Sequence, residues 1–329
     1  MSEQRSDPLL RHAEHSIAVG SKSFAAAARL FDPATRRSAM LLYAWCRHCD
    51  DVIDGQQAGH DALPLPAEQA RRRLADLQRQ TREIYAGLPA QTPAFAALGD
   101  VAQRHGIPPD EAFDLLEGFA QDVAGQRYAR PQDVLGYCYH VAGVVGLMMA
   151  RVMGVRDPAV LDRACDLGLA MQLTNIARDI VEDARVGRCY LPQAWLDEFE
   201  VPAWGLAEPR YRPAVAAMAE RLLAEAEPYY RSAQAGLAAL PWRSAWAVAT
   251  AALVYRRIGI KVQAAGVNAW DGRLATSRRE KLVAILSGLW RSLTRRLCRA
   301  QARDGRLWQR PGGIAARHGA RATDGASAR

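Results

Sequence analysis

The sequence predicts an all-α protein, and three observations support that prediction. Strand signals are nearly absent, since β-branched runs and hairpin dipeptides are scarce and alanine and leucine dominate. Helix starts are clearly marked, because Asp32-Pro33 and Asp157-Pro158 each place an N-cap residue before a proline at the first helical position. Connections between the apolar segments are mostly short and rich in proline and glycine. With 329 residues, half of them hydrophobic, the chain is long enough to bury a large core.

Hydrophobic periodicity between these boundary signals predicts ten helices, with turn-rich segments such as Gly55–Pro66 and Arg185–Pro192 between them. In chain order we expect helices at residues 8–29, 33–55, 66–86, 93–104, 109–125, 131–153, 158–184, 210–238, 242–266 and 275–300. From Gly305 the periodicity decays into Gly, Arg, Ala and Ser, which favours disorder. We therefore expect one domain over residues 1–300 and a basic, disordered tail over residues 301–329.

The net charge of +8 is concentrated at one end of the chain. Residues 291–329 hold ten arginines and two acids, whereas the first 290 residues hold equal numbers of basic and acidic side chains. With the charge confined to the tail and no recognition motif in the body, we expect no nucleic-acid partner. The tail is about equally compatible with a solvated segment and with an anionic membrane surface, on which Leu293, Leu297, Leu307 and Trp308 would rest.

The segment Val134–Ala150 is the best candidate for a membrane span, since it contains no Lys, Arg, Asp or Glu. It is slightly short for a span of about 20 residues, so we expect a helix buried inside a large helical domain instead. Six cysteines without a secretory signal do not form a disulfide scaffold, which favours a reducing compartment. We expect a cytoplasmic protein, with peripheral attachment to the inner face of the cell membrane as a hypothesis.

Two of the predicted helices carry aspartates at a four-residue spacing. Asp50 and Asp54 share one face of the helix 33–55, and Arg47 and Tyr43 continue that face toward its start. Like charges at this spacing destabilise a helix unless a cation joins them. Because the surrounding sequence is apolar, these carboxylates are not expected in open solvent.

The second stripe lies on the helix 158–184. Asp179 and Asp183 repeat the spacing, Asn175 and Gln172 lie earlier on the same face, and Arg178 precedes Asp179. Mg²⁺ prefers oxygen ligands and is usually held by one or two carboxylates together with substrate phosphates. Two such helices facing each other across a cavity would hold several Mg²⁺ ions bridged by a diphosphate, and arginines would neutralise the remaining charge. One such spacing arises by chance, but two with arginine and amide companions favour this site.

At these residues the chain resembles the squalene/phytoene synthase family, and most closely its bacterial phytoene-forming members. The resemblance covers about residues 15–290. The first aspartate-rich motif is matched by Asp50–Asp54, and the second, with its Gly-Arg-x-Tyr-Leu-Pro extension, by Asn175–Pro192. Further matches are the flap Ser21–Phe24, the helix segment Tyr137–Gly146, the late segment Tyr255–Ile258 and, less securely aligned, Arg273.

The resemblance implies an isoprenoid-synthase fold, which is a helical bundle around a central cavity. It also implies a head-to-head condensation of two geranylgeranyl diphosphate molecules to 15-cis-phytoene. In that family Mg²⁺ or Mn²⁺ held by the two motifs ionises one allylic diphosphate, and the double bond of the second substrate attacks the resulting cation. Proton loss gives a cyclopropyl diphosphate, which ionises, rearranges and loses a proton. That reaction begins carotenoid biosynthesis, so other enzymes of the pathway are possible partners.

Residue roles follow from the matched motifs. The metal ligands implied by the resemblance are Asp50, Asp54, Asn175, Asp179 and Asp183. The catalytic residues it implies are the same four aspartates with Arg47, Arg178, Tyr137 and Tyr255. The substrate-binding residues it implies are Ser21, Lys22, Phe24, Tyr43, Arg47, Val141, Gly146, Gln172, Asn175, Arg188 and Arg273. Val141 and Gly146 would line a channel for the isoprenoid tails, although small residues at helical spacing more often serve packing.

Two alternative functions stay open. A dehydrosqualene or squalene-type synthase would use C15 farnesyl diphosphate, and the sequence does not fix the cavity depth that separates the two substrates. A non-catalytic family member would act as a binding or assembly protein, but such a relative is expected to lose the motif acids. Squalene synthases reduce with a nicotinamide cofactor and usually carry a C-terminal membrane helix. The missing hydrophobic tail and the Tyr190–Pro192 ending favour a product formed without reduction, so no nicotinamide cofactor is expected.

Two other features receive a structural interpretation. Cys46 and Cys49 have the spacing of a zinc or redox pair, but no second pair matches and both lie inside a predicted helix. Asp122 lies near a helix end at Gly125. A position near the pocket mouth stays open, but we expect Asp122 to cap the helix or face solvent.

Overall fold

The structure is a computed structural model that describes residues 8–20, 27–55, 66–297 and 302–312. Within these residues the secondary structure is helical, and the β contribution is one isolated bridge between Tyr128 and Pro192. The all-α prediction is therefore confirmed. Its helices are α1 (Pro8–Gly20), α3 (Pro33–Asp54), α4 (Ala67–Tyr85), α5 (Pro93–His105), α6 (Pro109–Val123), α7 (Pro131–Cys138), α8 (Val144–Val152), α9 (Pro158–Arg185), α10 (Gln193–Glu198), α11 (Arg212–Gly236), α12 (Trp242–Ala265) and α13 (Arg278–Thr294).

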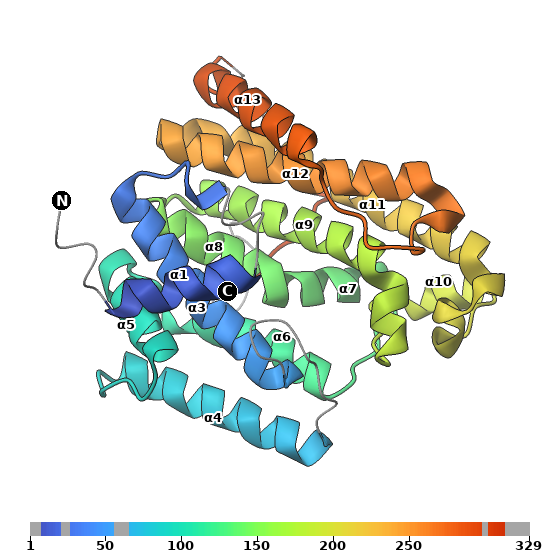
Figure 1. Ribbon diagram of the computed structural model, residues 1–329, viewed down its shortest axis with the longest axis horizontal. Coiled ribbons are helices and arrows are strands. Elements are labelled where there is room, and N and C mark those ends of the chain that lie inside the picture. The colour runs from blue at the N-terminus through green and yellow to red at the C-terminus, as the bar shows by residue number, and fades with distance from the viewer. Residues whose placement is uncertain (1–7, 21–26, 56–65, 298–301, 313–329) are drawn as a thin grey trace, which may run out of the picture.

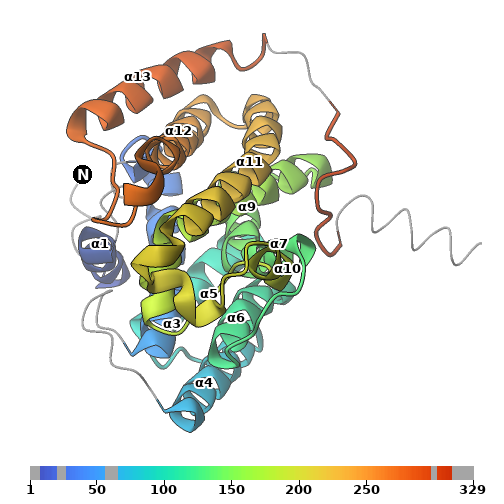
Figure 2. The same cartoon turned by 90° about the vertical axis from the view of Figure 1, so that its right-hand side faces the viewer.

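The longest helix, α9, runs through the middle of the bundle and packs against α8, α11 and α12 (Figure 1). Helix α3 packs against α1, α5 and α4, and α4 also contacts α6. Helices α4 and α13 lie at opposite edges of the molecule in both views (Figure 2). The core consequently extends from α4 to α12, with α9 at its centre and α13 as an outer layer on α12.

Both helix starts that the sequence marks with aspartate and proline are formed. The Asp32 carboxylate accepts hydrogen bonds from the backbone N–H groups of Ala34 and Thr35, at 3.1 and 3.0 Å. Asp157 accepts one from Ala159 at 2.9 Å. These bonds satisfy amide groups that have no partner inside the helix, which fixes where α3 and α9 begin.

The predicted helix 131–153 is interrupted. Residues Tyr139–Gly143 form a π-helical turn, η2, between α7 and α8. Such turns insert an extra residue into a helix and are often found beside functional sites. Here the turn lies against α9, where Gly168 approaches so closely that a Cβ atom would lie 2.3 Å from the Ala142 carbonyl oxygen. Periodicity alone predicts one continuous helix because the insertion leaves the apolar pattern nearly intact.

The segment 131–152 is the one described helix long and apolar enough to cross a membrane. About half of its most apolar window, 56%, is buried inside the bundle, between α6, α9 and the cavity described below. That burial agrees with the predicted core helix.

The expected disorder after Gly305 is wrong for residues 305–312. Leu307 is 7% exposed, and the Trp308 ring lies 5.5 Å from that of Tyr139. Arg310 forms an ion pair with Asp162 of α9 at 2.6 Å. The composition of this segment suggests solvated charges, but its arginines neutralise buried acids in the bundle. Residues 313–329 of the predicted tail lie outside the described residues.

Candidate active site

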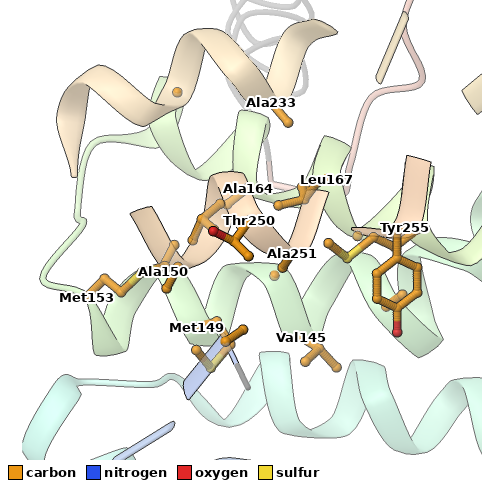
Figure 3. Close-up of a pocket in the computed structure, with 18 of the residues that line it drawn as sticks. Val145, Met149, Ala150, Met153, Ala164, Leu167, Ala233, Thr250, Ala251 and Tyr255 are labelled. Carbon is orange, nitrogen blue, oxygen red and sulfur yellow. The ribbon is translucent and has the colours of Figure 1, made fainter. Parts of the chain in front are cut away.

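An apolar cavity of about 380 Å³ lies beside α9. It is bounded by α8, α9, α11, α12 and the inner side of α13, and Figure 3 shows several of the side chains that form its wall. Most of these side chains are aliphatic or small, including Val145, Met149, Met153, Ala164, Leu167, Ala233 and Ala251. Such a cavity accommodates a long hydrocarbon and offers it few hydrogen-bonding groups.

Part of the cavity lining is polar. Tyr43 of α3, Gln172 and Asn175 of α9, and Tyr255 of α12 all line the cavity. Asp50 follows Tyr43 by two helical turns, and Asp179 follows Gln172 by two. Asp54 and Asp183 each lie one turn further along, so the cavity has an acidic mouth. Six residues predicted to bind substrate or act in catalysis line the cavity: Tyr43, Val141, Gly146, Gln172, Asn175 and Tyr255.

Gly146 lines the cavity and also lies at a close contact between α8 and α9. A Cβ atom at this position would lie 2.4 Å from the carbonyl oxygen of Ala164. Glycine therefore allows α8 to approach the backbone of α9 on one wall of the cavity. Gly146 thus lines the cavity and also permits close packing, while its contact with an isoprenoid tail stays a prediction.

The carboxylates of α3 are neutralised by arginines from two parts of the chain. Arg47 contacts Asp50 at 2.9 Å and Asp51 at 2.6 Å within the helix. Asp54 forms an ion pair with Arg188, which follows α9 in the extension of the second motif. The two motifs therefore meet through Arg188, although 134 positions separate the paired residues.

The carboxylates of α9 differ in their partners. Arg178 donates to Asp179 at 2.7 Å, and Arg273 lies 3.8 Å from Asp179 and 3.5 Å from Glu182. Arg273, whose match to the family is the least secure, therefore lies at the mouth. Within the described residues Asp183 has no ion pair, although it ends the same stripe.

One carboxyl of each motif resists ionisation. Desolvation raises the pKa of Asp50 to about 7, with a further contribution from the nearby charge of Asp54. Desolvation and the charge of Asp179 raise the pKa of Asp183 to about 7. Ionising these two carboxyls at the mouth therefore costs free energy, and a bound cation would remove that cost.

Two tyrosines and Asp122 form a half-buried cluster beside Arg188. Tyr137 and Tyr190 donate hydrogen bonds to the two oxygens of Asp122, at 3.1 and 2.9 Å, and their rings stack with centroids 4.7 Å apart. Desolvation raises the pKa of Asp122 to about 6. The expectation that Asp122 caps a helix or faces solvent is therefore wrong. The local sequence does not reveal this role, because both tyrosines come from other segments.

Donor chemistry at the mouth suits a hard divalent cation. The buried Oδ1 of Asn175 has no hydrogen-bond partner among the described residues, and it lies one turn before Asp179. No three His, Cys, Asp or Glu side chains in the described part of the chain converge as a complete metal cage. A site that relies on phosphate oxygens for its remaining ligands needs no such cage.

Ser21, Lys22 and Phe24 lie outside the described residues. Cys46 and Cys49 are free thiols inside α3, and burial raises the pKa of Cys46 to about 12.

Residues 17–280 match the sequence profile of the squalene/phytoene synthase family. The chain belongs to this family. Its members are synthases that use prenyl diphosphates and generally need a divalent metal.

Named relatives cover nearly the whole chain. A 15-cis-phytoene synthase of Pantoea ananas is 57% identical over 303 residues, which are 92% of this chain and 98% of the relative. A 15-cis-phytoene synthase of a Paracoccus species is 49% identical over 93% of this chain and 99% of the relative. Among solved structures, a dehydrosqualene synthase with bound ligand aligns with a TM-score of 0.77 and 28% identity over 87% of this chain and 96% of its own. The isoprenoid-synthase fold is therefore confirmed.

Proposed function

We propose that this protein is a prenyltransferase that condenses two molecules of geranylgeranyl diphosphate head to head to 15-cis-phytoene and diphosphate. Support comes from the relatives at 49–57% identity that carry this activity in their names and are matched over 98–99% of their length. The observation in the structure that carries the proposal is an acidic, arginine-rich mouth above an apolar cavity.

The arginines at the mouth are suited to bind the diphosphate groups. Arg47, Arg178, Arg188 and Arg273 come from three separate segments and already contact carboxylates there. Guanidinium groups form paired hydrogen bonds with phosphate oxygens, and they stay charged at every physiological pH. As the leaving diphosphate gains charge, these groups would stabilise it.

The residues that would hold metal are Asp50 and Asp54 on α3 and Asn175, Asp179 and Asp183 on α9. The raised pKa of Asp50 and Asp183 and the unpartnered Asn175 oxygen support this assignment. Two to three bound Mg²⁺ or Mn²⁺ ions would withdraw electrons from the diphosphate and favour its departure.

Below the mouth, the protein would protect a reactive carbocation. The aliphatic wall contains few groups able to trap a cation and excludes water. The Tyr43 hydroxyl lies at the boundary, and desolvation raises its pKa to about 12. Tyr255 shares that boundary, and its pKa is raised by the same cause. Both therefore remain neutral hydroxyls that can orient substrate without reacting as phenolates.

The test is incubation of the protein with Mg²⁺ and geranylgeranyl or farnesyl diphosphate, without a reductant, followed by hydrocarbon analysis. We expect a C40 hydrocarbon from the C20 substrate. A C30 product formed more efficiently from the C15 substrate would instead favour the dehydrosqualene-type alternative. No turnover of either substrate would favour a binding or assembly protein. A cytoplasmic location and contacts with other carotenoid-pathway enzymes remain predictions.

A further inference from the structure

Helix α13 turns its small residues toward the bundle, unlike an ordinary surface helix. Its small residues Ala284, Gly288 and Ser292 face the bundle, and each of them is buried. Gly288 approaches α12 so closely that a Cβ atom would lie 2.4 Å from the Thr250 hydroxyl oxygen. A surface helix of a soluble protein normally turns its large apolar residues inward.

Six large apolar side chains of this segment face outward, whereas Ile285 lines the cavity. The set consists of Leu282 at 56% exposure, Val283 at 62%, Leu286 at 59%, Trp290 at 69%, Leu293 at 61% and Leu297 at 83%. Most follow one another at three- or four-residue intervals, so they form one stripe along the helix. We call these six residues the α13 stripe. Scattered exposed apolar residues are normal, but a continuous stripe marks an interaction surface.

Figures 1 and 2 place α13 at the outer edge of the molecule, with α12 on its inner side. No described helix packs on the side that carries the stripe. The surface is therefore accessible to an external partner of large, flat extent.

The basic side chains around the stripe indicate the chemistry of that partner. Residues 278–297 include six basic side chains and one acid, Glu280. Glu280 is occupied by Arg257 at 2.8 Å and Lys261 at 3.3 Å. Arg278, Arg279 and Arg296 are exposed beside the stripe. An apolar helix face with tryptophan and leucine, bordered by arginines, is suited to the headgroup region of an anionic bilayer.

A second copy of this chain fits the surface less well. Two stripes placed face to face would bring the arginines of both copies together, with no free acids on α13 to balance them. Like charges across an interface oppose association. We therefore propose that the α13 stripe docks this protein on an anionic lipid surface.

The cavity lies close to the proposed docking surface. Lys281 and Ile285, on the inner side of α13, line the cavity, and they neighbour Leu282 and Leu286 of the stripe. A docked bilayer would thus lie one helix away from the cavity. This part rests on the proposed function, because a C40 hydrocarbon is insoluble in water and must pass into lipid. The docking itself does not depend on that reaction.

The tail is not the main anchor in this proposal. Leu307 is buried, and the Trp308 backbone N–H donates to the Tyr229 hydroxyl at 3.1 Å. Of the four apolar residues that the sequence suggests for a membrane-bound tail, only Leu293 and Leu297 are exposed, and both belong to the α13 stripe.

The experiment is co-sedimentation of the full chain with vesicles of phosphatidylcholine and phosphatidylglycerol in equal parts. The test variant is Leu286→Ser with Trp290→Ser. The matched control is Leu88→Ser with Trp204→Ser, which removes one leucine and one tryptophan of similar exposure, 55% and 67%, far from α13. We expect at least about a tenfold weaker partition for the α13 variant, because both substitutions remove apolar side chains that would insert into the bilayer. The control should bind like the wild type.

The electrostatic part is tested with Arg279→Gln, for which we expect about fivefold weaker binding to the anionic vesicles. Turnover in detergent should stay unchanged in all three variants, which separates docking from the proposed reaction. Equal vesicle binding by the wild type and the α13 variant would overturn the proposal. The proposal would also be overturned if the wild type shows no affinity for vesicles and forms a dimer in light scattering that the α13 substitutions dissociate.

Discussion

Helix α9 carries two aspartate pairs with the same four-residue spacing, and their surroundings differ completely. Asp162 and Asp166 lie in its first half, and both are buried in ion pairs with arginines of the segment 302–312. Asp179 and Asp183 lie near its end, at the mouth of the cavity, and within the described residues Asp183 has no ion pair. The spacing therefore does not identify a metal site. The partners that folding brings to each carboxylate decide whether it holds the fold together or remains available for a ligand.

The largest expected effect concerns the structural pair. Asp166 accepts two hydrogen bonds from Arg303, at 2.7 and 2.8 Å, and one from the Ser232 hydroxyl. Asp166→Asn removes the carboxylate that pairs with Arg303 in a buried site, so we expect a loss of about 3–5 kcal/mol in the free energy of unfolding. Urea denaturation measures it.

The matched control is Asp166→Asn combined with Arg303→Gln, which removes both charges and should cost less than the single substitution. At a temperature where the single variant Asp166→Asn is folded, this single variant should keep its metal-dependent turnover. A single variant as stable as the wild type would show that the two aspartate pairs do not differ as described.

The next effect concerns the pair at the mouth. Asp183→Asn removes an available carboxylate without breaking an ion pair, so the melting temperature should stay at or above that of the wild type. We expect turnover to fall by about 10²–10³-fold, the usual cost of losing one charge-stabilising group. Steady-state kinetics and thermal denaturation measure the two quantities. Unchanged turnover would exclude Asp183 from the metal site.

A smaller effect is expected between the pairs, where α9 forms the cavity wall. Gly168→Ala places a Cβ atom 2.3 Å from the Ala142 carbonyl oxygen, so we expect a loss of about 1–3 kcal/mol in stability from the forced backbone shift. Gly136→Ala is the control, because it has open space around its Cβ position in α7. It should be neutral or stabilise by up to about 1 kcal/mol. Equal effects of the two substitutions would contradict the close helix approach.

The last effect concerns pH. Asp50 and Asp183 have a pKa of about 7, so below that pH both bind protons that a metal ion must displace. The apparent affinity for Mg²⁺ should therefore rise by up to about tenfold per pH unit for each proton released, and level off above about pH 8. In the absence of metal the folded state binds these protons more tightly than the unfolded state, so stability should decline as pH rises toward 7. Calorimetric titration at several pH values tests the first expectation, and a pH-independent affinity would contradict it.

The sequence predicts this site well where its residues are local. Asp50 and Asp54, like Asp179 and Asp183, lie within single helices, so helical spacing and the matched motifs place them at the mouth. Partners from distant segments are harder to predict. Asp122 receives hydrogen bonds from Tyr137 and Tyr190, and no local pattern links those three residues.

Similar limits apply to the fold. Caps and periodicity predict most helices of the bundle, whereas the π-helical turn at Tyr139–Gly143 depends on packing against α9. The segment 302–312 has the composition of a solvated tail, and only the buried acids of α9 show why it packs. Helix α13 has ordinary amphipathic spacing, and the structure reveals that its apolar face is turned outward.

The most direct test of the account is a calorimetric titration of inorganic diphosphate into the protein, with and without Mg²⁺. We expect the wild type and Asp166→Asn, at a temperature where both are folded, to bind diphosphate only when Mg²⁺ is present, and we expect Asp183→Asn to bind it at least about tenfold more weakly. Equally tight binding without a divalent cation, or by Asp183→Asn, would contradict the claim that the carboxylates at the end of α9 hold the diphosphate through metal ions.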